Sequence, residues 1–247
     1  MSRTLKELKR AYGFEDVAIA PGGLTLNPEM VDISMSLDGI RLGIPFLASA
    51  MDAVVDPDFA IAMSKAGGLA VLNLDGIQTR YEDPRPLFIE IAETPGDAAT
   101  ELLQKIYSAP VQEKLVGKRV EQIVKGGGKA AVSVIPANTK RFAPLAVEAG
   151  AVVLVVQSTV TTARHSSKSV RGLIFHELVE QLKVPVLVGN TVSYDVTLEL
   201  MEEGVHGVLV GVGPGAACTS REVLGVGVPQ VSATLECAAA REEYFKT

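Results

Sequence analysis

One short pattern recurs along the chain: a helical stretch ends at a glycine, and an apolar, strand-like run follows at once. The pattern is found at 66–71, 149–154 and 203–209. Glycine at a helix C-terminus supplies the left-handed residue that lets the chain turn back into a sheet. Strands that alternate with helices in this way are typical of parallel sheets. The pattern therefore favours a (β/α) barrel or a doubly wound sheet.

Short apolar runs predict six strands with helices between them. The strands are expected at 45–50, 69–73, 130–135, 151–156, 184–188 and 206–211. The helices are expected at 57–66, 139–149, 169–182, 192–203 and 232–245. Two segments lie outside this alternation. Residues 1–44 form an N-terminal appendage that ends near the hairpin signal Asp38-Gly39, and residues 81–128 form a helical insertion. The glycine triplet 126–128 at its end is interpreted as a flexible linker.

The composition excludes several classes of protein. The chain has 247 residues, of which 47% are hydrophobic, and this supports a sizeable core and argues against disorder. A net charge of −6 disfavours nucleic-acid binding. Two cysteines form neither a disulfide framework nor a four-ligand zinc site. No apolar run approaches the ~18 residues of a membrane span, and the first residues lack a signal-peptide pattern. We therefore expect a cytoplasmic protein without nucleic-acid or membrane partners.

Polar residues follow nearly every expected strand. They are Ser49, Asp52, Asn73, Asn138, Gln157, Ser158 and Asn190. The strand N-termini carry mostly small or apolar residues, and we interpret His206, which enters a strand from that side, as structural. In (β/α) barrels the active site lies at the C-terminal ends of the strands. The polar residues at the C-terminal ends of the expected strands therefore predict an active site at those ends.

The glycine-rich loop at 211–230 is the most informative segment. Its opening G-x-G-x-x-A does not lead directly into a helix, so we reject a dinucleotide fingerprint. Cys218 lies in this loop beside Ser220 and Arg221. A guanidinium and loop amides lower the pKa of a thiol, which makes Cys218 a candidate nucleophile and Ser220 a candidate proton carrier. A free cysteine is otherwise a small buried apolar residue, and we interpret Cys237 in that way.

The cysteine loop resembles that of the IMP dehydrogenase/GMP reductase family. Three further motifs are similar to the family's: its N-terminal signature, first-strand motif and fifth-strand end correspond to 13–17, 48–54 and 188–190. The resemblance covers roughly residues 11–75 and 128–245. It implies a TIM (β/α)8 barrel that acts at purine C2 through a covalent cysteine intermediate, with NADPH or NAD as cofactor and a purine 5'-monophosphate as substrate.

The resemblance also assigns site residues by position. Cys218 and Ser220 would be catalytic, and Ser220 stands where the family has a threonine. Substrate contacts would come from Ser49, Met51, Asn190, Gly213 and Ala216. Cofactor contacts would come from Gln157 and Ser158, and a potassium ion would bind the carbonyls of Gly213, Gly215 and Cys218.

At several positions the chain differs from the family's pattern, and these differences narrow the choice of reaction. Ala216 and Gln157 replace a serine and an aspartate common in the family, and 81–128 stands where dehydrogenases carry a CBS-domain pair. The chain therefore resembles the CBS-lacking, IMP dehydrogenase-related branch. Residues 231–238 look more like GMP reductase, so we expect reduction of GMP to IMP with release of ammonia.

The alternatives are oxidation of IMP to XMP, a non-catalytic nucleotide-binding regulatory paralogue, and a flavin-dependent barrel enzyme. Family members are tetramers or octamers, so we expect a homo-oligomer.

The strands predicted from the sequence are too few for a complete barrel. About 250 residues suffice for a (β/α)8 barrel, yet this chain supplies only about six βα units. Six strands cannot close an eight-stranded barrel. We therefore expect one barrel domain over 1–247 that is an incomplete piece of a longer protein or is completed by something else.

Overall fold

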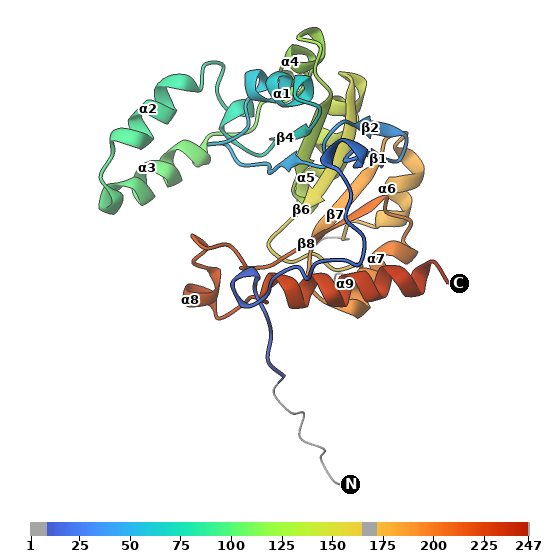
Figure 1. Ribbon diagram of the computed structural model, residues 1–247. Helices are drawn as coiled ribbons and strands as arrows, with labels where there is room; N and C mark the ends of the chain where they lie inside the picture. The colour runs from blue at the N-terminus through green and yellow to red at the C-terminus, as the bar shows by residue number, and fades with distance from the viewer. Residues whose placement is uncertain (1–8, 165–171, 247) are drawn as a thin grey trace.

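The computed structural model describes residues 9–164 and 172–246. Six parallel strands form its main sheet: Leu47–Ala48 (β3), Leu69–Asn73 (β4), Ala130–Val134 (β5), Ala151–Gln157 (β6), Val186–Thr191 (β7) and Gly207–Val210 (β8). Each strand pairs with the next in chain order, and the sheet curls with β3 and β8 at its edges (Figure 1). Sequential parallel order is that of a TIM barrel. The predicted fold class, a barrel of which this chain supplies six strands, is confirmed.

Helices connect the strands. They are Pro57–Lys65 (α1), Arg85–Glu93 (α2), Gly96–Ser108 (α3), Glu113–Lys125 (α4), Pro136–Glu148 (α5), Phe175–Gln181 (α6), Tyr194–Glu202 (α7), Ser220–Leu224 (α8) and Gln230–Tyr244 (α9). All five expected helices are present, although α6 begins later than expected and 169–171 lie outside the described residues. Helix α8 was not predicted. Within the described ranges, no helix has the length and apolar character needed to cross a membrane.

Alternate strand residues face two apolar layers. The layer between the sheet and the helices contains Leu72, Val132, Leu154, Val156 and Val188, with Phe142 of α5. The inner layer contains Leu69, Val71, Ala131, Val153, Val155 and Leu187. Successive side chains of a strand point to opposite faces, and both faces of this sheet are covered. This explains why the strands are continuous apolar runs rather than alternating ones.

A hairpin covers the N-terminal end of the inner layer. It is formed by Met35–Leu37 (β1) and Ile40–Leu42 (β2), and Leu42 is 1% exposed. The turn residues Asp38 and Gly39 have φ angles of 43° and 83°, as a two-residue Asp-Gly hairpin turn requires. His206 Nε2 lies 3.5 Å from Asp38 Oδ2, and its Nδ1 accepts the N–H of Val186 at 3.0 Å. The structural role predicted for His206 is confirmed.

The segment 81–128 contains α2, α3 and α4. Helix α4 packs against both α1 and α5, so it is the crossover helix from β4 to β5. Helices α2 and α3 form a hairpin that extends away from the sheet (Figure 1). The glycine triplet ends α4: Gly127 has φ +82°, and the N–H of Gly128 donates to Ile123 O at 2.9 Å. The flexible-linker interpretation is wrong, because these residues form a compact helix cap.

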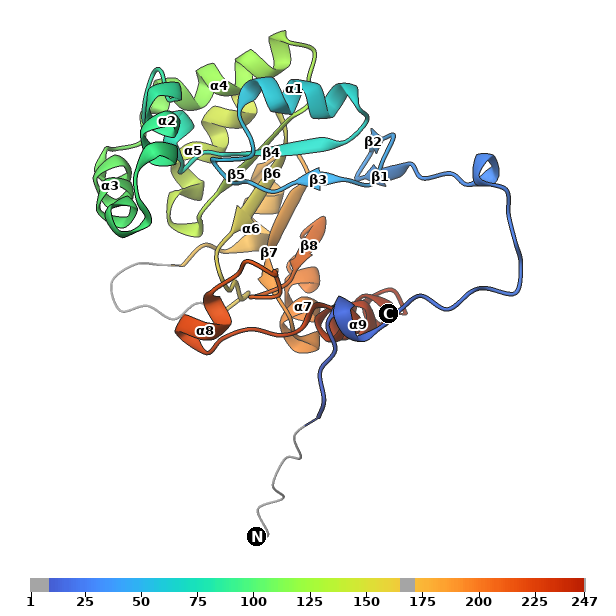
Figure 2. The ribbon, with the colours of Figure 1, turned by 60° about the vertical axis from the view of Figure 1, so that its left-hand side comes forward.

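The N-terminal segment reaches two distant parts of the fold. Between residues 9 and 34 its regular elements are two short 3-10 turns, Phe14–Asp16 and Pro28–Met30. Tyr12 is joined to Ser232 of α9, because its N–H donates to Ser232 Oγ at 2.9 Å and its carbonyl accepts the N–H of Ser232 at 3.2 Å. Figure 2 shows the segment running from α9 around the outside to β1.

Candidate active site

The loop after β3 carries Ser49 and Met51, both exposed, and the partly buried Asp52. Asp52 Oδ2 accepts the backbone N–H of Ile77 at 2.9 Å and the hydroxyl of Tyr107. Tyr107 belongs to α3 and was not among the predicted site residues. The carboxylate of Asp52 therefore ties the β3 loop to two segments that follow β4.

Asp75 connects the ends of β4 and β5. Its N–H donates to Asn73 Oδ1 at 3.0 Å. Its carboxylate accepts the N–H of Ile135 at 2.8 Å and Nδ2 of Asn138 at 2.5 Å. Asn73 and Asn138, two of the predicted polar residues, therefore shape neighbouring loops.

The ends of β6 and β7 bring predicted cofactor and substrate residues together. The N–H of Ser158 donates to Gly189 O at 2.9 Å, and the N–H of Asn190 donates to Ser158 O at 3.2 Å. The hydroxyl of Ser158 lies 2.9 Å from that of Thr161, which the sequence did not single out. The amide of the neighbouring Gln157 forms no hydrogen bond with the described residues. Ser158 thus shapes this loop, whereas the side-chain amide of Gln157 has no hydrogen-bond partner in the described part of the chain.

The loop after β8 is closed at its base. The N–H of Val228 donates to Val212 O at 3.0 Å, and Nε2 of Gln230 donates to Val210 O at 3.1 Å. These bonds hold the two ends of the loop together at the C-terminal end of β8. The loop therefore projects from the edge of the sheet at which the active site was predicted.

Two glycines let the chain fold tightly around Arg221. Gly213 and Gly227 have φ angles of +66° and +158°. A Cβ atom on Gly227 would lie 2.5 Å from Cγ of Arg221, and one on Gly213 would lie 3.2 Å from the same atom. Ala216 is exposed, and the carbonyl of Gly215 accepts the N–H of Cys218 at 3.1 Å.

Cys218 is a partly exposed free thiol. Its Sγ lies 3.4 Å from Oγ of Ser220. Hydrogen bonds from the side chain and backbone of Ser220 lower the pKa of the Cys218 thiol, and the positive charge of Arg221 lowers it further. Cys237 is buried, its Sγ lies 3.1 Å from Thr197 Oγ1, and burial raises its pKa. Because the thiolate is the reactive form, Cys218 has the environment of a nucleophile and Cys237 does not.

The candidate site is spread along the rim of the sheet. Cys218 follows one edge strand, β8, whereas Ser49 and Met51 follow the other, β3. Within the described parts of the chain, no hydrogen bond or ion pair joins these two loops. Asn190 lies at the end of β7, beside β8. The structure thus places Ser158, which directly follows β6, beside Asn190 at the end of β7, and the cysteine loop follows the next strand, β8.

Comparison with known proteins decides the family of this chain. The model of the IMP dehydrogenase / GMP reductase domain matches residues 11–246. The chain belongs to the IMP dehydrogenase/GMP reductase family.

Individual relatives support the family assignment. An uncharacterized oxidoreductase of Mycolicibacterium smegmatis is 37% identical over 99% of this chain and 66% of its own length. Inosine-5'-monophosphate dehydrogenase of Cryptosporidium parvum is 30% identical over 97% of this chain and 60% of its own. A crystal structure of an IMP dehydrogenase/GMP reductase-like protein from Corynebacterium glutamicum has a TM-score of 0.90 and 31% identity, covering 98% of this chain and 64% of that one. The chain spans 65–66% of the length of the first two mycobacterial oxidoreductases that it matches.

Proposed function

We propose that this chain belongs to a purine-nucleotide oxidoreductase that acts at purine C2 through Cys218, with reduction of GMP to IMP as the reaction. The observation that carries the proposal is the glycine-rich loop after β8, which presents a thiol of lowered pKa at the strand ends. Membership of the IMP dehydrogenase/GMP reductase family supports the choice of a purine nucleotide.

The proposed chemistry gives a role to three residues of the loop. The thiolate of Cys218 forms a bond to C2 of GMP, and the C2–N bond breaks to release ammonia. The hydroxyl of Ser220, which lies beside the sulfur, relays the proton lost by the Cys218 thiol to the departing nitrogen, so that the nitrogen leaves as ammonia. The positive charge of Arg221 stabilises the thiolate of Cys218, both before it attacks C2 and after the bond between sulfur and C2 breaks. We propose that Ser49, Met51, Asn190, Gly213 and Ala216 contact the nucleotide.

A nicotinamide cofactor, when bound, would supply the hydride to C2. Gln157 fits such a group, because its amide can pair with the carboxamide of a nicotinamide. Ser158 is engaged within its own loop, so we propose that it supports Gln157 rather than binding the cofactor directly. The carbonyls of Gly213, Gly215 and Cys218 are neutral oxygen donors that suit potassium. The carbonyl of Gly215, which already accepts one N–H, keeps a second lone pair for the ion.

The remaining proposals concern the whole protein. We propose that it works in the cytoplasm as a homo-oligomer, a tetramer or octamer, with NADPH rather than NAD as the cofactor. We also propose that residues 1–247 belong to one barrel domain, with 1–44 as an appendage. Within the segment 81–128, we propose that the α2–α3 hairpin stands in place of a CBS pair, since α4 is the crossover helix.

The test is a pair of assays on the complete purified protein. One mixture contains GMP and NADPH, the other IMP and NAD, and absorbance of the reduced cofactor is followed in both. We expect loss of NADPH in the first mixture, with IMP and ammonia as products. Formation of NADH in the second alone would identify the alternative, an IMP dehydrogenase. Nucleotide binding without turnover in either mixture would contradict the enzyme and favour a regulatory paralogue.

A further inference from the structure

The α2–α3 hairpin is attached to the rest of the fold mainly at its base. None of the residues of α2 is buried, and α3 buries only Ile106. Near the base, the hydroxyl of Tyr81 donates to Ile106 O at 2.9 Å, and the N–H of Gln112 donates to Thr79 O at 2.9 Å. The hairpin therefore has a defined position at its base and few buried contacts farther out.

Tyr107 lies at this base and connects it to the β3 loop. Its hydroxyl donates to Oδ2 of Asp52, across 55 positions of sequence. The guanidinium of Arg80 lies over its ring, 5.6 Å from the centroid, and also donates to Asp75 O at 3.0 Å and to the carbonyl of Ala109. The phenol is thus held in place from its ring side while its hydroxyl reaches the carboxylate.

Contacts at both oxygens hold the carboxylate of Asp52 in one orientation. Its Oδ1 is buried without a hydrogen-bond partner and packs directly on Gly76, where a Cβ atom would overlap it. The N–H of Ile77 donates to the other oxygen at 2.9 Å. The side chain of Asp52 is therefore fixed by three contacts: the N–H of Ile77, the hydroxyl of Tyr107 and the backbone of Gly76.

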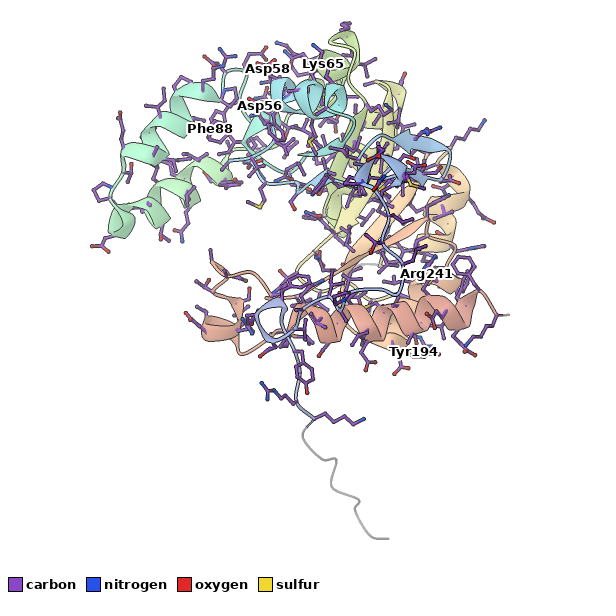
Figure 3. The ribbon with its side chains drawn as sticks, viewed as in Figure 1. Asp56, Asp58, Lys65, Phe88, Tyr194 and Arg241 are labelled. Atoms are coloured by element: carbon purple, nitrogen blue, oxygen red, sulfur yellow. The ribbon has the colours of Figure 1, made fainter. Side chains whose placement is uncertain are left out.

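The β3 loop has little other support on this side. A cavity of about 330 Å³ separates it from α2, with Asp52, Val54, Phe88 and Ile91 among its lining residues. Figure 3 shows Phe88 of α2 beside Asp56 at the start of α1, and both line this cavity. Because this space is open, the side of the loop that faces α2 is held by the contacts of Asp52 with Ile77 and Tyr107 rather than by side chains of α2.

We propose that Tyr107 is a positioning residue: through Asp52 it fixes the β3 loop so that Ser49 and Met51 meet the purine nucleotide. This proposal rests on the proposed function. The loop is internally stiff, since Met51 O accepts the N–H of both Val54 and Val55 at 2.9 Å. Met51 N–H also donates to Ser49 O at 2.8 Å, so fixing Asp52 fixes the residues beside it. Burial, more than the contact with Asp52, raises the pKa of the Tyr107 phenol and keeps it protonated as a donor.

The test compares Tyr107→Phe with the matched control Tyr81→Phe. Both changes remove one hydroxyl from the base of the hairpin, but the bond lost from Tyr81 goes to a carbonyl of α3. We measure amide hydrogen exchange over 49–55, the Kd and KM for GMP, and kcat. For Tyr107→Phe, loss of a hydrogen bond to a charged group predicts about tenfold faster exchange over 49–55 and about tenfold higher Kd and KM. We expect kcat to stay within about twofold, because no group that reacts is removed.

The outcomes separate this proposal from the proposed function. Faster exchange over 49–55 and weaker GMP binding in Tyr107→Phe, with the control unchanged, would support the positioning role. Equal effects of both variants, or unchanged exchange in Tyr107→Phe, would overturn it. If the wild-type chain binds no purine nucleotide, the proposed function fails, and the exchange comparison still decides whether Tyr107 fixes the loop.

Discussion

Replacing Cys218 by alanine is expected to reduce kcat by at least about a thousandfold, because removal of a covalent nucleophile leaves only binding and positioning. The thiol lies in a loop after β8, partly exposed, and its Sγ has Ser220 as its hydrogen-bond partner. Its loss should therefore leave the melting temperature nearly unchanged. The measurement is steady-state turnover of GMP with NADPH, together with thermal unfolding followed by circular dichroism.

The matched control is Cys237→Ala. This residue is the other free cysteine, but it is buried in α9 against Thr197. The control should keep kcat and lose stability by about 1 kcal/mol, as expected for a small buried group. Equal loss of turnover in both variants, or retained turnover in Cys218→Ala, would contradict the role given to Cys218.

Replacing Phe142 by alanine is expected to lower the free energy of unfolding by about 3–5 kcal/mol. Phe142 is 1% exposed and belongs to the apolar layer between α5 and the sheet. Its removal leaves a cavity in a layer that several strands and helices share, so the structure can close around it only in part. The measurement is urea unfolding at equilibrium, with the slope of the transition compared between variants.

Phe245→Ala provides the matched control for this prediction. Phe245 is 70% exposed at the end of α9. Substitutions at exposed positions usually change stability by less than about 0.5 kcal/mol. A loss of similar size in both variants would show that Phe142 does not pack in the core as described.

Much of the fold could be predicted because its signals are local. Glycine at a helix end and an apolar run after it identified the β/α alternation, and the apolar runs located β4 to β8 closely. Strand β3 was expected at 45–50 but covers only Leu47–Ala48, since it pairs with β4 alone at the edge of the sheet. The Asp38-Gly39 turn was also recognisable, because its geometry depends on those two residues themselves.

The rest of the site depends on contacts between distant residues. Nothing near Tyr107 in the sequence indicates that its hydroxyl meets Asp52, because that contact exists only once α3 is folded beside the β3 loop. The glycine triplet 126–128 has the composition of either a linker or a helix cap. Packing on Ile61 of α1 decides between them, since a Cβ on Gly128 would lie 3.2 Å from the Cα of Ile61.

The most direct test of the central claim, that the sulfur of Cys218 reacts at purine C2, is covalent trapping with 2-chloroinosine 5'-monophosphate. The thiolate forms a bond to C2 and chloride leaves, which gives the same sulfur–C2 adduct as loss of ammonia from GMP. NADPH is omitted, so no hydride is available to release the adduct. Intact mass and peptide mapping then locate the label. We predict one nucleotide per chain, on Cys218, with labelling blocked by GMP and absent from Cys218→Ala. Labelling of Cys237, or no labelling while the thiol of Cys218 still reacts with a small alkylating agent, would contradict the account.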